Sequence, residues 1–133
     1  MSTSALFASG PIIWKAFVST ANANRTGAGP LVPLCVGGVN PNGGAAGQNG
    51  TRVDRVTFIP LGTVVAGTVR LFIDGVFYDE QAVAAQTASG TAAQTKVRWS
   101  GLGLVLPVGV TLHGAVNDAS NNGWAVVVEG GVL

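Results

Sequence analysis

The sequence has few charged residues. Only 10% of its 133 residues are Asp, Glu, Lys or Arg, against about 25% in an average globular protein. The seven basic residues nearly balance the six acidic ones and are spread along the whole chain. A nucleic-acid interface would crowd basic residues on one face, so we expect no direct nucleic-acid binding. Low charge is typical of the centre of a permanent interface, which favours a surface covered by partners. A compact protein with a neutral Thr, Asn and Gln surface is the alternative.

Cysteine and histidine are almost absent. One cysteine, Cys35, cannot form an internal disulfide, and with one histidine, His113, there is no Cys/His cluster at metal-ligand spacing. We therefore expect no metal and no cofactor, and Cys35 to be a buried apolar thiol. The sequence shows neither a signal-peptide pattern nor an apolar run of the ~18 residues that cross a membrane, so we expect folding in a cytoplasm-like compartment and no membrane binding.

No catalytic pattern is present either. A catalytic site needs a nucleophile with a base and an orienting group, or two carboxylates held in different environments. His113 is predicted to lie on a strand, on the face opposite Leu112, as a surface or loop-contacting side chain. Asp79 and Glu80 are adjacent on a predicted strand, so they point to opposite faces and cannot act as a pair. We expect no enzymatic activity and no catalytic residue.

Short apolar segments that alternate with Gly, Pro and Asn turns are abundant, and they predict β structure. In residues 68–74, Val69, Leu71 and Ile73 alternate with residues that face the other way. Asp74–Gly75 then predicts a type I′ hairpin turn.

Two further patterns predict local irregularities. A bulge at Asp54–Arg55 is needed to return Val56 and Phe58 to the face of Val53. Pro33 predicts an edge position or a bulge, because proline cannot donate a ladder hydrogen bond.

The predicted fold class is all-β, an antiparallel β-sandwich that is jelly-roll-like, because about eight strands occur and no convincing helix. The strands are expected at residues 12–19, 31–36, 51–60, 68–74, 76–84, 95–100, 110–117 and 124–129. Residues 101–106 are a possible continuation of the sixth strand beyond a kink, and the alanine-rich residues 85–94 are expected to be a loop. The side chains predicted to point inwards are Val69, Leu71, Ile73, Val110, Leu112, Val126 and Val128.

The domain organisation is predicted as an extended N-terminal arm, residues 1–11, followed by one domain, residues 12–133. The arm and the long loop 37–50 lack the apolar periodicity needed to order themselves on the domain, so they are candidates for contact with a partner. Core or interface positions are expected for Trp14, Trp99 and Trp124, with a sugar-binding platform as the alternative. The candidate capsid or subunit interface residues are Leu6, Phe7, Pro11, Trp14, Pro41 and Asn42.

Residues 50–58 (GTRVDRVTF), 67–75 (GTVRLFIDG) and 106–112 (LPVGVTL) resemble small proteins encoded among the virion structural genes of tailed bacteriophages. Those proteins are similar to jelly-roll capsid decoration, or cement, proteins. The resemblance implies a small sandwich on the capsid surface of the virion, made in the host cytoplasm and often trimeric. Its implied partner is the major capsid protein, with a homotrimer favoured. The family carries no catalytic residues to transfer.

Two other functions fit the same sequence features. One is a host-recognition or carbohydrate-binding module of a phage head or tail fibre. The other is a structural subunit of the tail or connector. A sandwich with exposed aromatic side chains would serve the first, and fold alone does not separate them.

Overall fold

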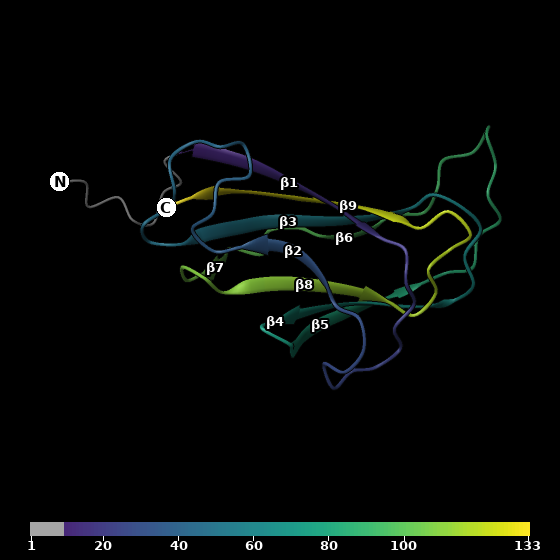
Figure 1. Cartoon of the computed structure of the whole chain (residues 1–133). Coiled ribbons are helices and arrows are strands. Elements are labelled where there is room, and N and C mark those ends of the chain that lie inside the picture. The colour runs from purple at the N-terminus through teal and green to yellow at the C-terminus, as the bar shows by residue number, and fades with distance from the viewer. Residues whose placement is uncertain (1–9) are drawn as a thin grey trace.

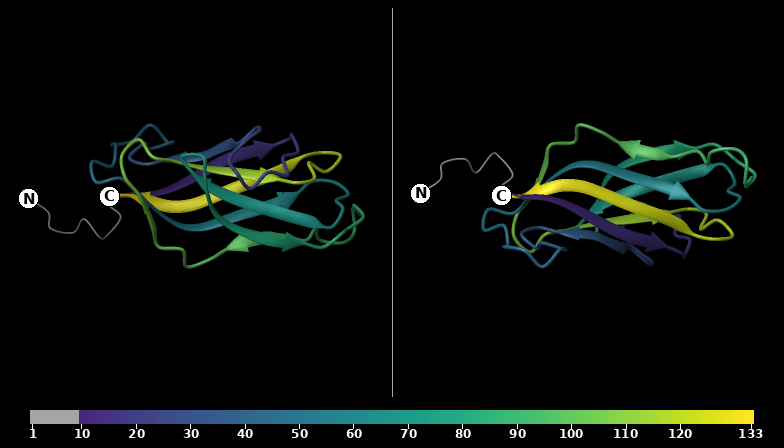
Figure 2. Two further views of the ribbon diagram at one scale, coloured as in Figure 1. Left: turned by 90° about the horizontal axis from the view of Figure 1, so that it is seen from below. Right: turned by 90° about the horizontal axis from the view of Figure 1, so that it is seen from above.

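A computed structural model describes residues 10–133, and this part of the chain forms nine β-strands and no helix (Figure 1). The strands are β1 (Gly10–Val18), β2 (Val32–Val36), β3 (Thr51–Pro60), β4 (Gly67–Ile73), β5 (Val76–Val83), β6 (Val97–Trp99), β7 (Leu104–Leu106), β8 (Thr111–Val116) and β9 (Trp124–Val132). They form two antiparallel sheets that stack as layers, which confirms the predicted all-β sandwich (Figure 2).

The larger sheet has the order β1-β9-β3-β6, and β7 also pairs with β3. The smaller sheet has the order β2-β8-β4-β5. The structure has one strand more than the predicted eight, because the sixth is interrupted. β7 follows β6 along β3, which agrees with the possible continuation at residues 101–106. Gly101 and Gly103 adopt positive φ angles of 63° and 56°, which only glycine adopts readily. The ladder is therefore interrupted by a kink after β6, and β7 resumes the pairing with residues 51–53 of β3.

The predicted turn and bulge are both confirmed. Asp74 and Gly75 have φ angles of 48° and 81°, as a type I′ turn requires. The register between β3 and β9 shifts between Val53 and Arg55. Val56 and Phe58 are consequently buried on the same side as Val53, and all three have 0% exposure.

The sheets enclose one apolar core. Of the seven residues predicted to face inwards, five are buried, namely Val69, Leu71, Leu112, Val126 and Val128. Ile73 and Val110 are partly buried and pack against that core. Phe58 meets Trp99 and Trp124 edge to face, with ring centroids 5.9 and 6.5 Å apart. These two tryptophans are core residues, as predicted, and each large apolar side chain buried in this way stabilises the fold by about 1.5–3 kcal/mol.

Two boundaries differ from the prediction. β1 begins at Gly10, so Pro11 belongs to a strand and not to the arm. It lies opposite Gly131, because β9 continues to Val132 instead of ending at Glu129. The remaining residues of the predicted arm, 1–9, lie outside the described residues, and Leu6 and Phe7 lie there with them.

The predictions for β2 and for residues 85–94 are confirmed. β2 is an edge strand, and its register with β8 shifts between Pro33 and Cys35. Cys35 is 1% exposed, and burial raises the pKa of its thiol to about 12. Residues 85–94 form a loop whose Gln86 pairs with Val64 in an isolated bridge.

The connection between β1 and β2, residues 19–31, lies against the outer face of the smaller sheet. Its Asn22 donates a backbone hydrogen bond to Val116 of β8 (2.7 Å). Gly27 lies so close to the Gly75 carbonyl that a Cβ would be 2.0 Å from it. Phe72, which alternation assigns to this outer face, is 0% exposed and meets Phe77 edge to face, with ring centroids 6.0 Å apart. Part of the outer face is therefore covered, whereas most of β5 remains exposed.

Candidate docking surface

One end of the sandwich gathers the segments that the sequence marks as contact candidates. We call it the arm end, and define it by the start of β1, loop 37–50, the turn 107–110 and the hairpin turn 74–75. Gly10 pairs with Val132, and Val132 also pairs with Thr51, where loop 37–50 ends. The opposite, or far, end carries loops 61–66, 84–96 and 117–123 (Figure 1).

Backbone hydrogen bonds hold the two ends of loop 37–50 on the domain. Gly38 donates its N–H to the Thr51 hydroxyl (2.8 Å), and Gly47 donates to the Gly38 carbonyl (2.9 Å). Gly109 donates to Gly37 (3.0 Å), which joins the loop to the turn 107–110. The expectation that this loop does not order itself on the domain is therefore wrong for its base, where backbone hydrogen bonds replace apolar packing.

The tip of the loop projects from this base. Gly43 donates to the Asn40 carbonyl (3.2 Å), and Asn42 donates its backbone N–H to the Asn40 side chain (2.9 Å), so residues 40–43 form a turn. Pro41 and Asn42 are exposed within it. The structure therefore presents two of the predicted interface residues side by side.

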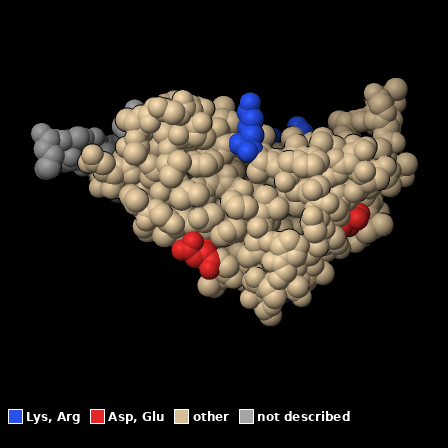
Figure 3. Space-filling model, in the orientation of Figure 1, with Lys and Arg blue, Asp and Glu red and all other residues tan. Residues whose placement is uncertain are grey.

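The arm end has few charged residues. Loop 37–50 and the turn 107–110 contain no Asp, Glu, Lys or Arg, and the hairpin turn contributes Asp74. Exposed valines lie in these two segments, since Val39 is 47% and Val108 63% exposed, and Val105 of the adjoining β7 is 47% exposed. Charged side chains are also sparse on the face drawn in Figure 3. A surface that lacks charge and exposes aliphatic side chains resembles the core of a protein interface.

Two further predicted interface residues, Pro11 and Trp14, lie on β1, and their environments differ. Pro11 is exposed and helps to line a surface hollow of about 380 Å³, together with Ile13, Arg55 and Glu129. Trp14 faces inwards, is half-buried and packs against the core. Its indole nitrogen is buried without a hydrogen-bond partner. Pro11 thus belongs to the arm end, whereas Trp14 lies between β1 and the core.

Sequence reasoning missed the exposed valines. Val108 stands between Pro107 and Gly109 in a turn, where neither strand periodicity nor burial explains an apolar side chain. An apolar residue in such a turn could have been recognised from the sequence as a candidate contact residue. The same holds for Val39, which stands in the long loop.

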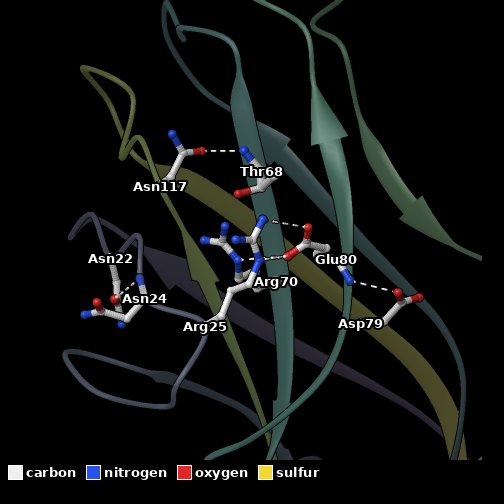
Figure 4. A network of polar contacts seen from close by, with 8 residues as sticks. All are labelled: Asn22, Asn24, Arg25, Thr68, Arg70, Asp79, Glu80 and Asn117. Carbon is white, nitrogen blue, oxygen red and sulfur yellow. Dashed lines mark hydrogen bonds and ion pairs between the residues drawn. The ribbon is translucent and has the colours of Figure 1, made fainter.

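An ion cluster lies away from the arm end and has a structural role. Glu80 of β5 accepts hydrogen bonds from Arg25 (2.8 Å) and from Arg70 of β4 (3.1 Å) (Figure 4). The guanidinium of Arg25, followed by that of Arg70, lowers the pKa of Glu80 to about 2, although partial desolvation opposes the shift. The cluster ties the 19–31 connection to the smaller sheet.

His113 lies on the outer side of β8, as predicted, opposite Phe72 of β4. Burial lowers its pKa, and the charge of Asp74 partly offsets that effect. Its Nδ1 atom is buried without a hydrogen-bond partner. The structure places neither a nucleophile nor a carboxylate pair around it among the interactions described.

Comparison with protein-family models, curated proteins and solved structures finds no match. Within residues 10–133, no group of three His, Cys, Asp or Glu side chains is placed to hold a metal ion. The same part of the chain contains no helix of the length and apolarity that spans a bilayer.

Proposed function

We propose that this protein is a capsid decoration, or cement, protein that binds the head of a tailed bacteriophage through its arm end and stabilises the shell. The observation that carries the proposal is the convergence of the strand that follows the arm, loop 37–50 and the turn 107–110 at one end that has few charges and exposes valines. Its partner is the major capsid protein, and a homotrimer on the virion surface is the favoured arrangement.

The strand order supports a jelly-roll assignment for the sandwich. Every connection between sequential strands crosses from one sheet to the other, except the β4–β5 hairpin and the step from β6 to β7. With β6 and β7 counted as one interrupted strand, eight strands remain, which is the jelly-roll number. This fold is common in viral shells, so it agrees with the proposed function without defining it.

The test is binding to heads that lack this protein, with paired variants of two equally exposed valines. Val108 at the arm end is 63% exposed and Val65 at the far end is 60% exposed. Val108→Lys places a charge in the proposed interface and should weaken occupancy by at least about tenfold, because a charge buried without a partner costs more than 1.4 kcal/mol. Val65→Lys should bind as the wild type does. Equal binding by both variants would overturn the arm end as the docking surface.

Deletion of residues 1–9 tests the arm separately. The deletion stops before Gly10, because Gly10 and Pro11 pair with β9. The shortened protein should keep the circular dichroism spectrum of the intact sandwich and should saturate heads only at higher concentration. Saturation at the wild-type concentration would transfer the anchoring role to loop 37–50 or to a sheet face.

Two outcomes would favour the other functions. Retention of the protein on host cell-surface glycans, without binding to heads, would support a host-recognition module. Recovery of the protein in purified tails would support a tail or connector subunit. Two of the three tryptophans are buried, which reduces the aromatic surface available for a sugar platform.

A further inference from the structure

Asparagine precedes glycine at three places, Asn42–Gly43, Asn49–Gly50 and Asn122–Gly123. This dipeptide is prone to spontaneous deamidation, because glycine has no Cβ to hinder attack by its backbone nitrogen on the asparagine side chain. The reaction also needs a flexible backbone and an accessible amide. The three sites share the same chemistry and differ in their surroundings, so the fold decides which of them reacts.

We propose that Asn42, at the tip of loop 37–50, is a site of spontaneous deamidation and that the fold protects the other two. The deprotonated backbone nitrogen of Gly43 attacks Cγ of Asn42. A bond forms between these atoms, the bond from Cγ to Nδ2 breaks, and ammonia leaves. Water then opens the resulting succinimide at either carbonyl, which gives aspartate or isoaspartate. One water is consumed, one ammonia is released, and no oxidant or reductant takes part.

The surroundings of Asn42 leave room for the reaction. Asn42 and Gly43 are both exposed. Beyond the neighbouring residues, no atom lies within 4 Å of the position of a Cβ built on Gly43. Among the contacts described for residues 10–133, the Asn42 side chain makes no hydrogen bond. One 3.2 Å hydrogen bond from the Gly43 N–H to the Asn40 carbonyl must open first.

The Asn49–Gly50 backbone is held on both sides. Asn49 donates to the Leu133 carbonyl (3.4 Å), and the Gly50 carbonyl accepts from the Leu133 N–H (3.0 Å). Gly50 is buried, and a Cβ there would lie 2.2 Å from the Leu106 carbonyl oxygen. The backbone rotation that forms a succinimide is therefore blocked.

The Asn122–Gly123 pair is held through Leu61. The Asn122 amide donates to the Leu61 carbonyl (3.3 Å), and the Gly123 carbonyl accepts from the Leu61 N–H (2.9 Å). Gly123 is buried against the Phe17 ring, which a Cβ would approach to 2.3 Å. This pair reacts only after local unfolding.

The consequence for docking rests on the proposed function. Loop 37–50 has no charged residue, so deamidation places the first carboxylate on it. Isoaspartate also adds one atom to the backbone of the turn. A deamidated copy should therefore dock more weakly. A copy that is already docked should be shielded and keep Asn42. Deamidated protein should therefore accumulate among the unbound copies and be rare on heads.

The chemical half is tested by incubating the purified protein at mildly alkaline pH and following each asparagine by peptide mass spectrometry, with an isoaspartate methyltransferase assay. The Asn42 peptide should deamidate at least about tenfold faster than the other two, since each 1.4 kcal/mol of local opening slows a protected site tenfold. In denaturant the three rates should converge. Equal rates in the folded protein, or slower reaction at Asn42, would overturn the proposal.

The effect on docking is tested with variants that imitate the deamidated form or keep the amide. Asn42→Asp should bind heads at least about tenfold more weakly, as an unpaired interface charge does. Thr87→Asp, which puts the same charge on an exposed far-end loop, should bind normally. Asn42→Gln, which keeps an amide, should bind more tightly than Asn42→Asp, so that the comparison isolates the charge. If Asn42 deamidates and Asn42→Asp binds normally, the docking consequence is wrong while the modification stands. If Val108→Lys also binds normally, the proposed docking end itself is wrong.

Discussion

The indole nitrogen of Trp99 donates a 3.0 Å hydrogen bond to the carboxylate of Asp79 and so joins the two sheets at their edge. Trp99 belongs to β6 of the larger sheet and Asp79 to β5 of the smaller one. Gln81, two residues along β5, donates to the Arg98 carbonyl in the same way (2.9 Å). Polar bonds therefore close this side of the sandwich, where the sheets have no shared ladder.

Replacement of Asp79 by Ala should destabilise the protein by about 1–3 kcal/mol, because it leaves a buried indole N–H without an acceptor. Urea unfolding followed by tryptophan fluorescence measures the change. Asp79→Asn keeps an acceptor and should recover most of the loss. If the alanine variant unfolds at the wild-type midpoint, the hydrogen bond does not contribute to closing the edge.

Replacement of Gly75 by Val should cost on the order of 1 kcal/mol or more, because a β-branched residue resists the φ of 81° found there. Gly90 provides the matched control. It is exposed, has open space around it and does not adopt a positive φ. Gly90→Val should leave the melting temperature nearly unchanged, and equal losses in the two variants would show that the turn conformation is not the cause.

Stability should fall in acid as Glu80 is protonated. The Arg25 guanidinium, with Arg70, lowers the pKa of Glu80 from 4.5 to about 2. A carboxyl whose pKa is lower in the folded state stabilises the fold fully above its unfolded pKa, and the contribution disappears as the pH falls from about 4.5 towards 2. Unfolding midpoints of the wild type and Glu80→Gln should differ at neutral pH and converge near pH 2.

Glu129→Gln is the control for this titration. It removes a longer ion pair, in which Arg55 lies 3.7 Å from the carboxylate. Its difference from the wild type should be smaller at every pH. A constant difference for Glu80→Gln across the acid range would contradict the pH dependence.

Cys35 should not react with a thiol reagent in the folded protein. Burial raises the pKa of its thiol to about 12, so the reactive thiolate is scarce, and the side chain is 1% exposed. A colorimetric disulfide reagent should label one thiol in denaturant and almost none in its absence. Rapid labelling of the native protein would show that β2 opens readily.

The sequence predicts this fold well where local sequence alone determines the conformation or burial of a residue. Alternation places Val69 and Leu71 in the core, and Asp74–Gly75 defines its turn without help from distant residues. The sequence does not reveal that Phe72, on the opposite face, is buried. The 19–31 connection approaches that face at Gly75, across more than forty residues of chain. The ion pair between Arg25 and Glu80 is not predictable either, because nothing near one residue in the sequence identifies the other as its partner.

The candidate docking surface was partly predictable for the same reason. The composition of loop 37–50 predicts Pro41 and Asn42 as candidate contact residues, and both are exposed. Val108 was not, because its significance depends on the neighbourhood of Gly38, which hydrogen bonds between distant loops create. For Trp14 the sequence predicts either a core or an interface position, and the structure places it on the inner side of β1, packed against the core.

The position of β9 determines when this domain can fold during synthesis. β9 lies between β1 and β3, yet it is the last of the nine strands to leave the ribosome. Until residues 124–132 emerge, β1 and β3 have no common neighbour, and the nascent chain exposes open strand edges of the kind that aggregate. The larger sheet can therefore close only after residues 124–132 have emerged, and a ribosome-bound chain that stops before Trp124 should remain sensitive to protease.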